Sequence, residues 1–65
     1  MNYEFIVIGA KPDGDDLSFK FVSDTHTSLD SAVTEYYAKA APYPVAFIEV
    51  FEDLVRVAKI QPVQI

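Results

Sequence analysis

The segment Tyr3–Ala10 constrains the fold more than any other part of the chain. Its β-branched and aromatic residues follow one another directly, which is typical of a β-strand. The apolar side chains would point to both faces of that strand: Tyr3, Phe5 and Val7 to one face, Ile6 and Ile8 to the other. Because a strand that is apolar on both faces is usually covered on both sides, we expect this segment to lie at the centre of a sheet.

The next segments predict a hairpin partner for this strand. Residues 11–16 contain a proline followed by an Asp-Gly pair, which is typical of a turn. The run Leu17–Ser23 then alternates between apolar and polar side chains. We expect its apolar residues to face the core: Leu17, Phe19 and Phe21. The alternation and the lysine within this run are typical of a half-exposed edge strand.

An amphipathic helix is expected over residues 28–40. Thr27 or Ser28 can cap its first turn, and Asp30 in that turn is favoured by the helix dipole. Apolar residues recur at three- and four-residue spacing on one side of this helix: Leu29, Ala32, Val33, Tyr36 and Ala40. The prolines at positions 42 and 44 end the helix, because proline lacks a backbone donor.

Two more strands are expected near the C-terminal end. Val45–Phe51 is apolar on both faces apart from Glu49, and Leu54–Ile60 reads as a further strand. The Glu-Asp pair at 52–53 is either a tight turn or a bulge in one long strand. One strand of 16 residues would be unusually long, so we favour a hairpin. The tail, residues 61–65, is expected to be loose.

These elements predict a single α+β domain over residues 1–65, with the order β-β-α-β-β. The helix returns the chain to its starting end, so the third strand is expected beside the first and antiparallel to it. The result is an antiparallel sheet of three to four strands in the order 2-1-3-4, with one helix packed on one face. The first strand is then central, as its two apolar faces require.

One helix covers only one face of this sheet, so the other face is expected to expose apolar residues. The exposed set would be either Ile6, Ile8, Ile48 and Val50, or Tyr3, Phe5, Val7, Phe47 and Phe51. A contiguous exposed apolar patch usually marks an interface with a partner or with a second copy. The alternative is that the fourth strand curls the sheet and the tail folds over the patch.

The composition excludes several classes of protein. The chain has no cysteine, which rules out disulfides and thiolate zinc sites. Ten acidic against five basic residues give a formal net charge of −5, which argues against direct nucleic-acid binding. No segment has the roughly 18 to 20 apolar residues that span a bilayer, and no signal peptide is recognisable. We therefore expect a cytoplasmic protein without membrane contact.

The residue pattern offers no catalytic or metal site. His26, the single histidine, lies in a polar segment and is expected to be a solvated loop residue without a nucleophile beside it. Asp13 and Asp24 stand at the first and twelfth positions of an apparent calcium loop, but strand residues lie between them. A chain of 65 residues also leaves little room for a pocket. We expect no enzyme activity, no cofactor and no bound metal.

The distribution of negative charge is the most informative feature of the surface. Seven acidic residues fall at the two ends of the predicted sheet: Asp13, Asp15 and Asp16 at one end, and Asp24, Asp30, Glu52 and Asp53 at the other. The five basic residues do not obviously neutralise either group. Carboxylates spread over a sheet can imitate a run of phosphates and occupy a basic nucleic-acid channel. The alternative is that acidic residues collect at turns because they favour turns and aid solubility.

The order of elements, the acidity and the helix opening Ser28-Leu29-Asp30-Ser31-Ala32-Val33 resemble small host-takeover proteins of bacteriophages. Those of the T-odd coliphages that inhibit bacterial RNA polymerase carry a similar helix followed by a strand with arginine, and small anti-CRISPR proteins have a similar layout. Here Arg56 lies on the late strands, and Lys59 lies beyond it. The resemblance implies inhibition of a host protein.

Two functions follow as hypotheses. In the first, the chain binds and inhibits or redirects a host protein that has a basic or nucleic-acid-binding surface, such as RNA polymerase. The seven end carboxylates and Arg56 would be the binding residues. In the second, the chain is a homo-oligomeric structural or accessory protein, and the uncovered sheet face is the interface of a homodimer.

Overall fold

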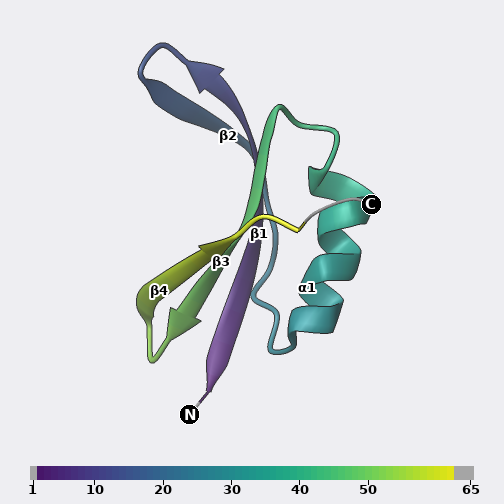
Figure 1. The fold of residues 1–65 in the computed structure, drawn as a ribbon, viewed down its shortest axis with the longest axis vertical. Helices are drawn as coiled ribbons and strands as arrows, with labels where there is room; N and C mark the ends of the chain where they lie inside the picture. The colour runs from purple at the N-terminus through teal and green to yellow at the C-terminus, as the bar shows by residue number, and fades with distance from the viewer. Residues whose placement is uncertain (1, 63–65) are drawn as a thin grey trace.

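A computed structural model, which describes residues 2–62, confirms the predicted α+β architecture (Figure 1). The strands are β1 (Tyr3–Asp13), β2 (Asp16–Val22), β3 (Val45–Glu52) and β4 (Val55–Ile60). They form one antiparallel sheet in the predicted order β2-β1-β3-β4. Between β2 and β3, helix α1 (Leu29–Glu35) continues into a π-helical turn, η1 (Tyr36–Ala40). Of residues 61–65, expected to be loose, 61 and 62 are irregular and 63–65 lie outside the described residues.

The first hairpin closes through a turn shorter than the sequence predicted. β1 continues to Asp13, which pairs with Asp16, so only two residues form the turn. Gly14 has a φ of 63°, a conformation that glycine adopts without steric cost. Pro12 lies in β1 opposite Leu17, beyond Ala10, where the pairing with β3 ends. Only β2 pairs with this part of β1, and such an edge position tolerates proline. The expected turn over residues 11–16 was therefore too long.

The second hairpin is confirmed, with its turn one residue later than predicted. Glu52 belongs to β3 and pairs with Val55, so the turn residues are Asp53 and Leu54. Both have positive φ angles, 52° and 70°, as in the type I′ turns that fit the twist of a hairpin. Leu54 was expected to begin the fourth strand, but it is the second residue of the turn.

The core lies between the helix and one face of the sheet. Val7 of β1 and Ile48 of β3 have no exposed surface and are the largest fully buried side chains. The buried cluster consists of Val7, Ala32, Tyr36, Ala40, Ala46 and Ile48. The predicted apolar side of the helix therefore packs on the sheet, except that Leu29 is 43% exposed at the first turn.

The pairing register corrects the expected division of residues between the two faces. Val7 pairs with Ile48, and Ile8 pairs with Phe47. Residues directly opposite in an antiparallel pair point to the same face, so Val7 and Ile48 share the helix-covered face. The expected sets placed odd-numbered residues of both strands together. In the structure each pair joins an odd-numbered residue to an even-numbered one, which sequence alone does not specify.

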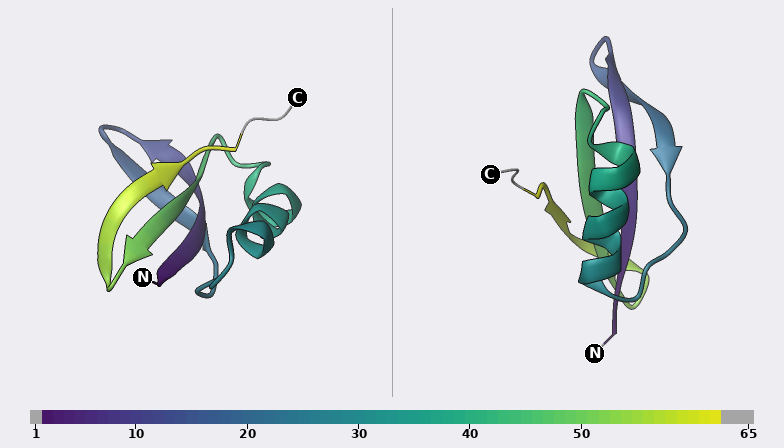
Figure 2. Two further views of the ribbon diagram at one scale, coloured as in Figure 1. Left: turned by 60° about the horizontal axis from the view of Figure 1, so that its bottom comes forward. Right: turned by 90° about the vertical axis from the view of Figure 1, so that its right-hand side faces the viewer.

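The face turned away from the helix is curved, and its centre is buried. Ile8 is 4% exposed and Phe47 is 2% exposed. The register shifts by one residue in both outer pairings, and such bulges bend strands and increase twist. Figure 2 shows β4 arching away from the helix, and the Lys59 ammonium lies 4.5 Å from the centre of the Phe47 ring. The expectation that this face exposes its apolar centre was wrong.

The exposed apolar residues lie at the edges of the sheet instead. Leu17 and Phe19 on β2 are 41% and 56% exposed, although both were expected to face the core. Their part of the β1–β2 hairpin extends beyond the helix (Figure 1). The register shift lies between the pairs that join Gly9 to Phe21 and Ala10 to Phe19. Phe21 packs against the core, whereas Phe19, beyond this shift, does not.

Candidate functional site

Three of the predicted binding residues gather at the tip of the β1–β2 hairpin. Asp13 and Asp16 form the last pair of the two strands, and Asp15 is in the turn between them. All three are exposed. Residues 16–22 form β2, so the acidic turn leads into a strand and not into a calcium-binding loop. The tip is an acidic projection at one end of the sheet (Figure 1).

The opposite end of the sheet carries a second acidic group. Asp30 lies in the first turn of α1, and Glu52 and Asp53 lie at the β3–β4 turn. Figure 1 shows the start of the helix and this turn at the same end, away from the hairpin tip. Asp24 lies further along the sheet, in the segment that runs beside β1 between Val7 and Phe5.

The ion pairs leave these carboxylates without cationic partners. In residues 2–62, Glu35 and Glu49 are the acidic residues that form ion pairs. Glu35 lies 3.7 Å from the Lys39 ammonium and also binds the histidine, whereas Glu49 lies 3.3 Å from the Arg56 guanidinium. Arg56, predicted to bind a partner, is thus engaged within the sheet, although its side chain stays 59% exposed.

The histidine is held in a network and is not a solvated loop residue as predicted. His26 Nε2 lies 2.6 Å from Glu35 Oε1, and its Nδ1 lies 2.9 Å from Ser31 Oγ. Sequence patterns did not predict this hydroxyl–imidazole–carboxylate series, which places a serine hydroxyl beside an imidazole nitrogen. The Ser31 hydroxyl also bonds the Ser28 carbonyl oxygen at 3.1 Å in the helix cap. The network therefore joins the segment after β2 to the helix.

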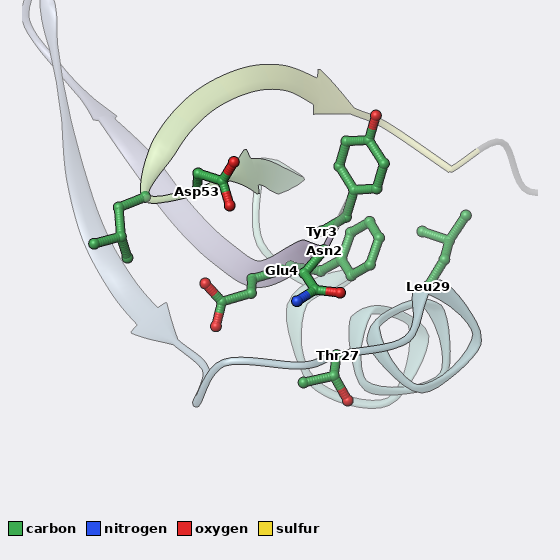
Figure 3. A pocket seen from close by; sticks show the side chains of 8 residues that line it. Asn2, Tyr3, Glu4, Thr27, Leu29 and Asp53 are labelled. Atoms are coloured by element: carbon green, nitrogen blue, oxygen red, sulfur yellow. The ribbon is translucent and has the colours of Figure 1, made fainter.

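A depression of about 840 Å³ lies at the second acidic end (Figure 3). It is lined by Asn2, Tyr3, Glu4, Phe5, Thr27, Leu29, Asp53 and Leu54. We call this depression the end groove. A smaller depression of about 230 Å³ is lined by Glu4, Ile6, Thr25, Phe51 and Leu54. The depression is open to solvent and is lined by three separate segments of the chain, which the sequence did not bring together.

Leu54 is the most unusual residue of the end groove. Its side chain is 86% exposed, the highest value among the exposed large apolar residues. Its φ of 70° places a branched side chain in the left-handed region, where residues other than glycine lose about 1–2 kcal/mol. The Glu-Asp pair predicted a turn here, but no sequence pattern predicted that Leu54 would lie in the turn with its side chain exposed.

Comparison with protein families, with characterised proteins and with solved structures finds no match to this chain. The helical segments within residues 2–62 lack the length and apolar character that crossing a bilayer requires.

Proposed function

We propose that this chain is a small, non-catalytic protein of the phage host-takeover type. It binds a host protein in the host cytoplasm at a basic, nucleic-acid-binding surface, such as that of RNA polymerase, and inhibits or redirects it. One observation carries this proposal. The exposed aspartates at both ends of the sheet have no ion-pair partner among residues 2–62, while the ion pairs serve Glu35 and Glu49.

The spacing of the two acidic groups suits a nucleic-acid mimic. β1 has 11 residues and connects the two ends. At about 3.3 Å per residue the groups stand roughly 30 Å apart, close to the 34 Å of one DNA turn. Unpaired carboxylates over this span attract a basic surface and guide the encounter with it.

Apolar contacts beside the acidic tip add to the charge. Leu17 and Phe19 are exposed immediately after the three aspartates of the tip. Protein interfaces commonly combine such an apolar anchor with a charged rim, because the anchor supplies binding energy and the rim supplies orientation. The β1–β2 hairpin therefore has both parts of a docking element.

Affinity capture from a bacterial lysate tests the proposal. The wild-type chain is compared with a triple variant, Asp13→Asn, Asp15→Asn and Asp16→Asn, and captured proteins are identified by mass spectrometry. We expect the wild type to retain a nucleic-acid-binding protein and the triple variant to lose it. Ser31→Ala should capture the same protein, because a binding protein does not need the Ser31 hydroxyl.

A charge-restored variant separates arrangement from net charge. The triple substitution is combined with Thr34→Glu, Ala38→Glu and Ala41→Glu at exposed positions beyond the hairpin, which returns the formal net charge to −5. This variant should also fail to capture the partner. Recovery of capture would show that only the total charge matters and would contradict a role for the hairpin tip.

A further inference from the structure

We propose that the end groove docks a partner segment in which apolar side chains alternate with arginine or lysine. This inference rests on the proposed function and assigns the chemistry of the partner at the second acidic end. The occupant is a basic, apolar peptide segment of the bound protein. The shape of the groove, its charge and the conformation of Leu54 each support that assignment.

The walls of the end groove present apolar surface that the fold leaves uncovered. Tyr3 and Leu29 are 44% and 43% exposed, and Leu54 is 86% exposed. They come from the start of β1, the start of α1 and the β3–β4 turn, and all three line the groove. Figure 3 labels Tyr3 and Leu29 on one side of it. Burying such side chains against apolar groups of a partner would contribute about 25 cal/mol per Å².

The smaller depression extends this surface onto the uncovered face of the sheet. Glu4 and Leu54 line both depressions, so the two are neighbours. Ile6 and Phe51 supply the apolar lining of the smaller one. A peptide laid across Leu54 can therefore place one apolar side chain in each depression, which favours an alternating segment over a single inserted residue.

The charge of this end selects a cationic partner. Glu4 and Asp53 line the end groove, and none of its lining residues is lysine or arginine. Asp30 follows the lining residue Leu29. Arginine and lysine side chains of an incoming segment would supply the donors and the charge that these carboxylates lack.

The conformation and exposure of Leu54 support the assignment independently of charge. A leucine that is both strained and exposed lowers the stability of the isolated chain, whereas glycine or asparagine would fit the turn. Backbone strain of this kind clusters at binding and switch sites. We therefore assign Leu54 as the apolar anchor of the docking surface.

Three labelled peptides of eight residues test the assignment with the full chain. The first alternates arginine and leucine, the second replaces each arginine by glutamate, and the third replaces each leucine by serine. Fluorescence anisotropy at about 150 mM salt, close to physiological ionic strength, measures binding. We expect the first peptide to bind and the other two to bind at least about tenfold more weakly, since each lacks one class of contact.

Amide chemical shifts locate the peptide on the protein. We expect the arginine–leucine peptide to shift the amide signals of Glu4, Thr27 and Leu54. Shifts confined to the hairpin tip, or spread over all acidic residues without saturation, would overturn the inference. Equal binding of the serine peptide would also overturn it, because charge alone would then explain binding.

Leu54→Gly removes the anchor without threatening the fold. The substitution relieves the positive φ, so the variant should be as stable as the wild type or more stable. It should bind the arginine–leucine peptide at least about tenfold more weakly, as for an interface anchor. The matched control is Val22→Ser, which removes an apolar side chain that is 55% exposed elsewhere and should leave peptide binding unchanged.

Lysate capture distinguishes failure of this inference from failure of the proposed function. Retention of the captured partner by Leu54→Gly, together with its loss from the hairpin triple variant, would overturn the end groove as a docking site and leave the proposed function standing. Undiminished capture by the hairpin triple variant would contradict the proposed function. Loss of capture in both variants, together with peptide shifts at the groove, would support both.

Discussion

Gly9 shows how a single residue sets the distance between the sheet and the segment after the helix. It pairs with Ala46 on the helix-covered face, and a Cβ atom built on it would overlap the Tyr43 ring. Tyr43 lies between two prolines that follow the helix. Glycine is needed at this position because the aromatic ring approaches the backbone closely.

We predict that Gly9→Ala destabilises the fold by about 1–3 kcal/mol, because an added methyl group in a packed site forces neighbours to move. Urea unfolding of the wild type and the variant measures this change. The penalty should shrink in a background of Tyr43→Ala, where the ring is absent. An unchanged penalty in that background would show that Tyr43 is not the cause.

The segment that follows β2 behaves as part of the sheet. Ser23 donates its backbone N–H to the Val7 carbonyl oxygen, and His26 exchanges two backbone hydrogen bonds with Phe5 at 2.8 Å each. The histidine side chain then reaches Glu35 on the helix. This polar segment was expected to be a connection, but it links the helix to β1 by backbone and side-chain bonds.

We predict that His26→Ala lowers the free energy of unfolding by about 1–2 kcal/mol, because it removes two side-chain hydrogen bonds and leaves Glu35 with one partner. A double-mutant cycle with Glu35→Ala should give a coupling energy near 1 kcal/mol. Thr25→Ala, an exposed neighbour, is the control and should change stability little. A coupling energy of zero would contradict the role of this contact.

Local patterns were sufficient to predict the elements and their order. The alternating run predicted β2, the spacing of Ala32, Tyr36 and Ala40 predicted the buried side of the helix, and the two apolar faces of β1 placed it in the interior of the sheet. These features depend on residues close in sequence. Hydrophobic period and turn chemistry are therefore enough to recognise them.

Properties that depend on register could not be predicted in this way. Ile8 and Phe47 lie on the same face because they pair directly across β1 and β3. A shift of the pairing by one residue would move one of them to the other face. The contact of His26 with Glu35 and the end groove join segments far apart in sequence. Phe47 is buried on the uncovered face of a sheet whose outer pairings contain bulges, and no sequence pattern predicted those bulges.

The whole molecule has a buried apolar core and a surface on which negative charges outnumber positive ones. The centre of the uncovered sheet face, Ile8 and Phe47, is buried within the single chain. The acidic residues at the two ends remain without ion pairs among residues 2–62. Mutual repulsion between such ends opposes self-association and favours a basic partner.

We predict that the purified chain is monomeric at micromolar concentration, with a mass of 7.3 kDa by sedimentation equilibrium. Raising the salt concentration should leave this mass unchanged, because the apolar centre of the sheet is already buried. A mass twice as large would favour the homo-oligomeric alternative. The exposed edge residues Phe19 and Val57 would then be the first candidates for the dimer interface.

The salt dependence of binding to the captured host protein is the most direct test of the central claim. If unpaired carboxylates occupy a nucleic-acid site, the dissociation constant should rise at least about tenfold between roughly 50 and 200 mM salt, and duplex DNA should displace the chain. A dissociation constant that stays constant over this range, with no displacement by DNA, would contradict the account.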